Sequence, residues 1–254
     1  MTQHQSRGGD ATQPAIILHQ FAPMYGLPNP SPFCIKLETY LRMAGFQYVT
    51  KVIKGPPRSS TGKAPYIEID GALHCDSGLI IAHLETAYGH RVEGRLTLAE
   101  RAQSLAMRRL MEEHLYWAAV YARWLDPDNK GPVGGYIRDV IGVPGWLFTF
   151  IRPMIQRQMR KAVRAQGLGR HDAATIWQLS IGDVQALGHW LGNRPFGFGD
   201  TPTVVDAVMF SFIASIVRTP WDFPLKTHTL KHRNLVDHAE RMMRTYFPEL
   251  AATP

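Results

Sequence analysis

The sequence predicts an α/β unit followed by an all-helical unit. Up to about residue 90, short β-branched runs alternate with helical patterns, whereas later apolar residues recur at three- and four-residue spacing. With 254 residues, 45% of them hydrophobic and 19% charged, the chain is long enough to bury a core in each unit. We expect residues 15–89 to form the first domain and residues 96–250 the second, joined by a linker at 89–94.

The first unit contains turn signals that separate its elements. Gly45 closes a helical pattern, the run 55–60 is a loop by its Gly, Pro and Ser content, and Asp70-Gly71 is a hairpin turn. The predicted elements are strands at 15–21, 47–53, 66–69 and 72–75 and helices at 34–44 and 78–88. The order is therefore β-α-β-loop-β-β-α.

The second unit begins with one long amphipathic helix at 98–124, which carries apolar residues on one face. A loop at 126–135 ends it. Further helical patterns cover residues 146–165, 173–191, 203–217 and 234–246.

Thr203 and Asp206 form a capping box, in which each side chain bonds the other residue's backbone N–H. The helix that follows, 204–217, is apolar almost all round, so we expect it to be the buried centre of the helical unit. The structural role of Asp206 is favoured over a catalytic one.

Composition excludes several classes of protein. Only Cys34 and Cys75 are present, which favours a reducing, cytoplasmic location without a disulfide framework. Residues 1–14 are polar, which indicates a disordered tail and not a signal peptide, and no segment has the length and apolarity of a membrane span. The histidines show no metal-ligand spacing, so no metal site is expected.

The formal charge is +7, and much of the basic excess lies at 152–170. A solvated helix face is the favoured interpretation, because no nucleic-acid motif accompanies it. Contact with an acidic lipid or an acidic partner remains open.

The turn Ser31-Pro32-Phe33-Cys34 links an apolar strand to a helix. The start of a helix presents unpaired N–H groups and the positive end of the helix dipole, which stabilise an anion such as a thiolate. The thiol in question is either that of Cys34 or one that a ligand brings to the turn.

Four segments together resemble the glutathione transferase superfamily over residues 15–250. Ser31-Pro32-Phe33-Cys34 resembles its active-site turn, Gly62 to Tyr66 its cis-proline segment, Asp76-Ser77 its acidic-Ser pair, and 198–206 its buried capping-box helix. The resemblance implies an N-terminal thioredoxin-like domain followed by an all-helical glutathione-transferase C-terminal domain.

The amino-acid sequences of four segments resemble those of the failed-axon-connections and metaxin-like branch of that superfamily, including its bacterial relatives. These segments are 31–40, 63–68, 165–171 and 234–249. Some members of this branch act in protein import or sorting at mitochondria.

The resemblance implies glutathione as co-substrate. Ala64 and a cis Pro65 would hold the cysteinyl part of glutathione, and Asp76 and Ser77, with the N–H groups of their helix, would hold the γ-glutamyl end. Lys63, Lys54 or Arg58 would supply positive charge for the glycine end. Ser31 would donate a hydrogen bond to the glutathione sulfur and lower its pKa. The thiolate would then attack a small electrophile.

The electrophile is expected in an apolar pocket between the turn at Phe33 and the long helix near His114, Trp117 and Tyr121. Aromatic residues in such a pattern also suit a plain helix core, and that interpretation stays open.

Cys34 has two interpretations. It occupies the place of the resolving cysteine in thioredoxin-type motifs, but Ser31 replaces the first cysteine. A buried, inert thiol is favoured, and the alternative is a monothiol thioltransferase in which Cys34 forms a mixed disulfide with glutathione.

One departure from the superfamily affects the predicted function. A short Pro- and Ser-rich loop at 53–65 stands where ordinary members have a helix that contributes to the glycine end of glutathione. The leading prediction is a cytoplasmic glutathione S-transferase, a homodimer as its relatives usually are. The alternative is a noncatalytic metaxin-like adaptor that uses the basic helix as a contact surface.

Overall fold

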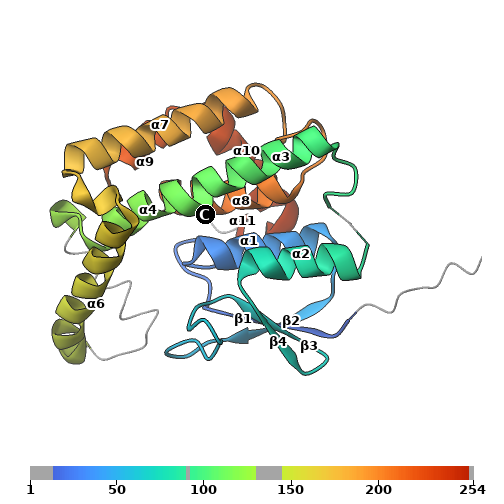
Figure 1. Cartoon of the computed structure of the whole chain (residues 1–254), viewed down its shortest axis with the longest axis horizontal. Helices are drawn as coiled ribbons and strands as arrows, with labels where there is room; N and C mark the ends of the chain where they lie inside the picture. The colour runs from blue at the N-terminus through green and yellow to red at the C-terminus, as the bar shows by residue number, and fades with distance from the viewer. Residues whose placement is uncertain (1–13, 90–91, 130–144, 252–254) are drawn as a thin grey trace, which may run out of the picture.

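The computed structural model describes residues 14–89, 92–129 and 145–251 (Figure 1). The predicted tail at 1–14 therefore lies outside the described residues except for Pro14, as do part of the linker and most of the loop at 126–135. The described chain forms a small mixed sheet with its helices and a larger helical unit beside it.

The first unit has the predicted order of elements. They are β1 (Ile16–Gln20), α1 (Pro32–Met43), β2 (Tyr48–Val52), β3 (Tyr66–Ile69), β4 (Ala72–Cys75) and α2 (Ser77–Ala87). The strands lie in the order β2-β1-β3-β4, with β1 parallel to β2 and antiparallel to β3, and β3 antiparallel to β4. The thioredoxin-like arrangement of the first unit is confirmed.

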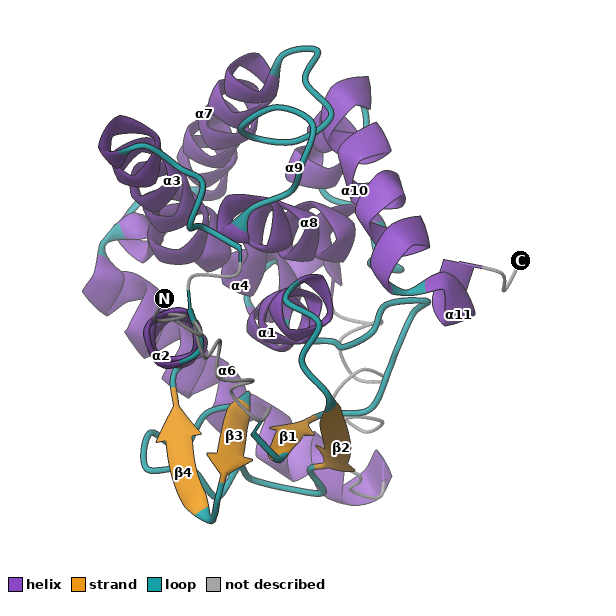
Figure 2. Cartoon of the chain, turned by 90° about the vertical axis from the view of Figure 1, so that its right-hand side faces the viewer, coloured by secondary structure: helices purple, strands orange, loops and turns teal. Residues whose placement is uncertain are grey.

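Both helices of this unit cover one face of the sheet (Figure 2). Side chains alternate between the two faces of a strand, and Ile16 and Leu18 of β1 and Ile67 and Ile69 of β3 point to the helices, where they are buried. Residues such as Leu41 of α1 complete this core.

The second unit consists of helices joined by loops in its described residues. It contains α3 (Leu98–Arg109), η1 (Leu110–Leu115), α4 (Tyr116–Trp124), η2 (Pro127–Asn129), α6 (Gly145–Gln166), η3 (Leu168–Arg170), α7 (Ala173–Leu191), α8 (Val204–Val217), α9 (Pro224–Thr229), α10 (Arg233–Tyr246) and α11 (Pro248–Ala251). The sequence did not predict α9, a short helix after Pro224, or α11. No helix within the described ranges has both the length and the apolarity needed to cross a membrane.

The long helix predicted at 98–124 is continuous but not uniform. Its middle, η1, is π-helical, with one extra residue per turn, between the α-helical segments α3 and α4. The apolar spacing of the sequence does not reveal this change, because a π turn shifts the residues that follow by only one position.

Helix α8 lies at the centre of the helical unit (Figure 2), as its all-round apolar sequence predicts. At its start, Asp206 Oδ2 accepts the Thr203 N–H (2.7 Å) and the Thr203 hydroxyl (3.0 Å). Asp206 Oδ1 accepts the Gly197 N–H and pairs with His238 Nε2 at 3.0 Å, all within the core. This confirms the structural interpretation of Asp206.

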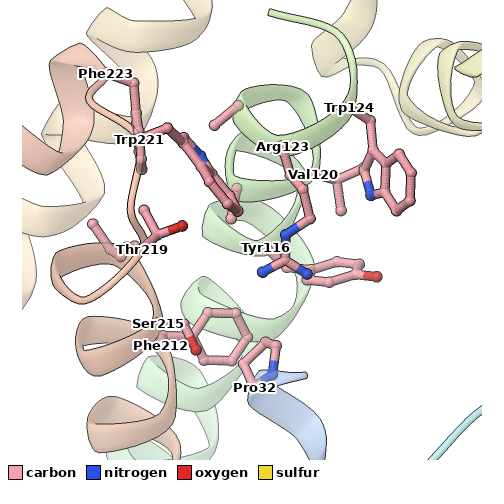
Figure 3. A pocket seen from close by; sticks show the side chains of 13 residues that line it. Pro32, Tyr116, Val120, Arg123, Trp124, Phe212, Ser215, Thr219, Trp221 and Phe223 are labelled. Atoms are coloured by element: carbon pink, nitrogen blue, oxygen red, sulfur yellow. The ribbon is translucent and has the colours of Figure 1, made fainter. Parts of the chain in front are cut away.

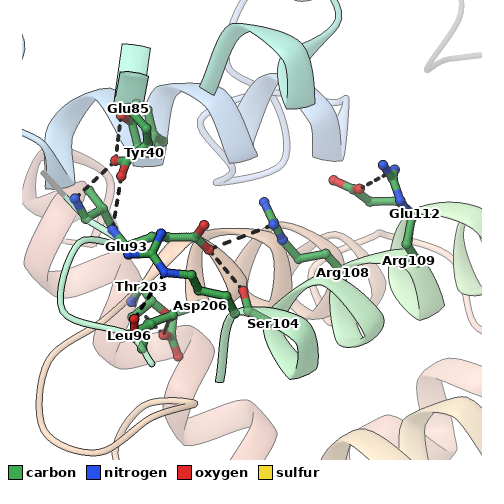
Figure 4. A network of polar contacts seen from close by, with 12 residues as sticks. Tyr40, Glu85, Glu93, Leu96, Ser104, Arg108, Arg109, Glu112, Thr203 and Asp206 are labelled. Carbon is green, nitrogen blue, oxygen red and sulfur yellow. Dashed lines mark hydrogen bonds and ion pairs between the residues drawn. The ribbon is translucent and has the colours of Figure 1, made fainter. Parts of the chain in front are cut away.

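Carboxylates connect the two units near the linker (Figure 4). Glu85 of α2 accepts hydrogen bonds from the Tyr40 hydroxyl (2.9 Å) and the Val92 N–H (3.1 Å). Glu93, the residue after Val92, accepts a hydrogen bond from the Ser104 hydroxyl of α3 (3.0 Å). The contacts fix the path of the chain from α2 to α3.

Candidate active site

Asn29 shapes the turn between β1 and α1. It is fully buried, its Nδ2 donates to the Phe21 carbonyl (2.7 Å), and its Oδ1 accepts the Ser31 N–H (3.1 Å). Ser31 takes the N-cap position of α1, Pro32 follows as the first helical residue, and the Ser31 side chain makes no capping bond. The partly exposed Ser31 hydroxyl is thus placed at the positive end of the α1 dipole.

Cys34 lies one turn further, inside the protein. Its side chain is completely buried, and burial raises the pKa of the thiol to about 12, against smaller opposing effects of the Ser31 side chain and the Phe21 backbone. The thiol is therefore protonated at neutral pH and shielded from disulfide substrates.

The Ala64–Pro65 peptide bond is cis, as the resemblance to the superfamily implies. Tyr66 pairs with His19 across β1 and β3, so Pro65 lies beside the end of β1, from which the turn to Ser31 begins. Lys63 is exposed, and its backbone N–H and carbonyl both bond the Ser59 hydroxyl (3.0 and 2.7 Å). The loop before Pro65 contains no helix, which confirms the predicted departure.

Asp76 and Ser77 begin α2. Asp76 Oδ1 accepts the N–H groups of Gly78 (2.8 Å) and Leu79 (3.1 Å), so the protein's own carboxylate satisfies two N–H groups expected to hold a ligand. An Asp at an N-cap competes with any anion for these donors, and the binding of a ligand by Asp76 and Ser77 stays a prediction. Ser77 is buried at this helix start, and Asp76 has a strained φ of +69°, a feature that clusters at functional sites.

A buried ion pair that the sequence analysis missed lies behind this site. Lys36 Nζ of α1 is 2.5 Å from Glu112 Oε1 of η1, with side chains 3% and 8% exposed. A Cβ at Gly78 would lie 3.9 Å from Lys36 Nζ, so the ammonium adjoins the start of α2. Burial lowers the pKa of Lys36, whereas Glu112 and then Asp76 raise it. The sequence offered one signal for this ion pair: a lysine on the buried face of a predicted helix, where a charge needs a partner.

A cavity of about 60 Å³ opens beside the turn at Ser31 and Pro32, between α4 and α8 (Figure 3). Pro32 lies at one end and Trp221 and Phe223 lie at the other. Thr219 contributes a buried hydroxyl that has no hydrogen-bond partner among the described residues. The other lining residues come mainly from α4 and α8: Tyr116, Ala119, Val120, Ala122, Arg123, Trp124, Phe212, Ser215 and Ile216.

The predicted pocket residues lie elsewhere. His114 faces α7, where its Nδ1 is 2.5 Å from Asp183 Oδ2, and Tyr121 packs edge to face on Trp177 of the same helix. Phe33 packs on Tyr116, which is also in ring contact with Trp117. None of Phe33, His114, Trp117 and Tyr121 lines the cavity described above, because it opens on the neighbouring face of α4.

Burial raises the pKa of Asp183, and the His114 hydrogen bond opposes that rise. The contact between His114 and Asp183 links η1 to α7. Within the described ranges, no three metal-ligating side chains come together.

Two family models match the chain. The one described as the glutathione S-transferase N-terminal domain matches residues 32–129, and the one described as the glutathione S-transferase C-terminal domain matches residues 181–242.

Three curated proteins show the range of relatives. Failed axon connections of Drosophila melanogaster is 33% identical over 246 residues, which are 92% of this chain but 58% of that protein. Isoprene-epoxide–glutathione S-transferase of Rhodococcus sp. (strain AD45) is 30% identical over 236 residues, 91% of this chain and 99% of that enzyme. Metaxin-2 of Homo sapiens is 24% identical over 75% of this chain and 72% of its own.

Solved structures share the fold. The beta-etherase of Sphingobium sp. strain SYK-6 superposes with a TM-score of 0.60 at 14% identity, over 93% of this chain and 98% of that one. A glutathione S-transferase of Methylobacterium radiotolerans, in complex with glutathione sulfonate, gives 0.59 at 16% identity over 94% and 96% of the two chains.

Proposed function

The chain belongs to the glutathione S-transferase family, in the branch that includes Failed axon connections and the metaxins, and we propose that it transfers glutathione to a small electrophile. The observation that carries the proposal is the position of Ser31. Its hydroxyl is at the α1 N-terminus, in a turn that lies beside the cis Pro65.

Ser31 would donate a hydrogen bond to the glutathione sulfur. Together with the dipole of α1, this bond favours the thiolate over the thiol and lowers the thiol pKa. The Ala64 backbone would pair with the cysteinyl part of glutathione, and Asp76 and Ser77 would bind its γ-glutamyl end. Asp76 suits the ammonium in particular, because its carboxylate is exposed.

The electrophile would occupy the cavity between α4 and α8. We propose an epoxide, the class named for the Rhodococcus relative. The thiolate attacks a ring carbon, a C–S bond forms, and the C–O bond of the ring breaks to leave an alkoxide that then takes a proton from water. The Thr219 hydroxyl, buried in the cavity wall, would donate a hydrogen bond to that oxygen.

Steady-state kinetics with glutathione and either chlorodinitrobenzene or a small epoxide test the proposal. Ser31→Ala is expected to lower kcat about a hundredfold, as the loss of one preorganised donor does. Thr219→Val should impair the epoxide reaction but spare the chlorodinitrobenzene reaction, in which no alkoxide forms.

Cys34→Ala distinguishes the thioltransferase alternative, against which the burial of this thiol argues. The variant should retain most of the conjugation rate. If Cys34→Ala removes activity on a disulfide substrate and on chlorodinitrobenzene while Ser31→Ala does not, the roles assigned to the two residues are wrong.

A noncatalytic role is the second candidate, and the loop at 53–65 favours it. In the structure this loop has no helix, and Ser59 holds the backbone of Lys63. Isothermal titration with glutathione decides between the candidates. Binding that is weakened in the Ser77→Ala variant supports the transferase. The absence of a binding signal at millimolar glutathione supports the noncatalytic protein.

We also propose that the chain acts as a cytoplasmic homodimer, as the resemblance to the superfamily implies. Light scattering should give twice the mass of the chain, 28.6 kDa. A mass equal to one chain at micromolar concentration would contradict the dimer.

A further inference from the structure

Helix α6 has an unusual balance of charge. Over its 22 residues it carries five basic side chains and no aspartate or glutamate. The basic residues are Arg152, Arg157, Arg160, Lys161 and Arg164. The helix is therefore a local concentration of positive charge on a chain whose formal charge is already +7.

One side of α6 anchors it to the rest of the protein. Val163 is fully buried, Gln156 Nε2 donates to the Trp124 carbonyl of α4 (3.1 Å), and Gln166 Nε2 donates to the Glu113 carbonyl (3.2 Å). Figure 1 shows the N-terminal end of α6 projecting away from α4 and α7. Much of the rest of the helix, among its described side chains, is exposed.

Three large apolar side chains lie on this outward side. Trp146, Phe150 and Met154 are 70%, 75% and 65% exposed, and their four-residue spacing aligns them along one face of the helix. Single exposed apolar residues are common on protein surfaces, but an aligned row with two aromatic rings marks an interaction site.

The basic residues continue the same row. Arg157 and Lys161 follow Met154 at three- and four-residue spacing, and both are exposed, as are Arg160 and Arg164. The outward face of α6 is thus apolar in its N-terminal half and cationic in its C-terminal half.

We propose that α6 docks on an anionic membrane surface. Tryptophan, phenylalanine and methionine partition into the boundary between headgroups and acyl chains, while arginine and lysine pair with lipid phosphates. A nucleic-acid duplex would match the charge but offers no apolar phase for the row at 146–154. The helix lies on the surface and does not cross it.

Flotation of the full-length protein with vesicles tests this. Vesicles of phosphatidylcholine mixed with phosphatidylserine should bind the protein, pure phosphatidylcholine vesicles should bind it weakly, and high salt should release it. The variant Arg157→Gln/Arg160→Gln/Lys161→Gln/Arg164→Gln should bind about tenfold or more weakly. The variant Trp146→Ser/Phe150→Ser/Met154→Ser should lose binding as well.

Matched controls use exposed residues of other helices. Leu98→Ser/Leu105→Ser on α3 removes exposed apolar side chains, and Arg233→Gln/Arg244→Gln on α10 removes exposed charge; both should bind as the unchanged protein does. Circular dichroism establishes that each variant is folded. Equal binding to neutral and anionic vesicles, no binding at all, or equal losses in the controls would overturn the proposal.

A second copy of the chain could bind the same row of Trp146, Phe150 and Met154 in place of a membrane. If the Trp146→Ser/Phe150→Ser/Met154→Ser variant changes the mass measured by light scattering and the unchanged protein does not bind anionic vesicles, the face is a self-association surface and the membrane proposal fails.

Discussion

Cys34 and Ser31 are three residues apart and have opposite environments. The cysteine points into the core with an exposed fraction of 0%, whereas the serine stays at the protein surface. The sequence presented both as candidates, because the helix dipole acts on any group at the turn. Burial outweighs the dipole at Cys34, since removing the thiolate from water disfavours its charge.

We predict that Cys34 does not react with a soluble thiol reagent in the folded protein. Because burial raises the pKa of the thiol to about 12, raising the pH from neutral to mildly alkaline should not expose a thiolate. In Cys75→Ala, where Cys34 is the remaining cysteine, the colour from a disulfide reagent should appear only after denaturant is added. Rapid reaction without denaturant would contradict the burial of this thiol.

The ion pair of Lys36 and Glu112 gives a second prediction at the scale of single residues. Both side chains are nearly inaccessible, so Glu112→Gln takes the paired carboxylate away from the buried Lys36 ammonium. Glu112→Gln should lower the free energy of unfolding by about 3 kcal/mol, measured by urea denaturation. Lys36→Met should lower it less, because Glu112 Oε2 still lies 3.5 Å from an Arg109 guanidinium nitrogen.

The double variant Lys36→Met/Glu112→Leu separates charge from packing. It removes both charges, so it should cost less than the sum of the single variants. Additive losses would show that the two side chains do not interact.

The capping boxes at the starts of α3 and α8 share a sequence motif but differ in burial. Thr97 and Glu100 form an exposed capping box at α3, and Thr203 and Asp206 form a buried one at α8. The sequence motif is of the same type, but in α8 the carboxylate also accepts the Gly197 N–H and pairs with His238.

We therefore predict unequal losses of stability. Thr203→Ala should cost on the order of 1 kcal/mol, and Thr97→Ala should cost no more than this. Asp206→Ala should cost about 3 kcal/mol, because it leaves several buried donors unpaired. Thermal and urea denaturation of the three variants measure the difference, and equal losses for Asp206→Ala and Thr97→Ala would refute the role of burial.

The elements themselves were largely predictable. The hairpin strands at 66–69 and 72–75 and the helix bounds at 173–191 agree with the structure, because turns, caps and apolar spacing act within a few residues of the chain. The helix α9 was missed because six residues are too few to show a period. The π-helical segment η1 was missed because it shifts the apolar spacing by only one position.

At the scale of the whole molecule, the two units share a core. Leu27 and Ile35 of the first unit belong to the buried cluster that surrounds α8. Arg42 of α1 donates to the Tyr246 carbonyl (2.6 Å), pairs with Glu249 (2.7 Å) and lies over the ring of Phe247. These contacts couple the sheet to the end of the helical unit.

We predict that both units unfold in one cooperative transition. All six tryptophans lie in the helical unit, so their fluorescence reports that unit, while Cys34 reports the first. In Cys75→Ala, the urea midpoints of tryptophan fluorescence and of Cys34 reactivity should coincide. Exposure of Cys34 at a lower urea concentration would show that the first unit unfolds separately.

The sequence by itself determined most of the strands and helices, with their caps and turns, because each of these depends on neighbours within a few residues. Through its resemblance to the superfamily, the sequence also predicted Ser31, Pro65 and Ser77 as site residues. Tertiary structure decided that Cys34 is buried, that Lys36 meets Glu112 from 76 positions away, and that the cavity opens on the face of α4 next to Pro32. The reason is that burial and long-range pairing depend on how helices pack against each other, and apolar spacing specifies which face of a helix is buried but not which partner it meets.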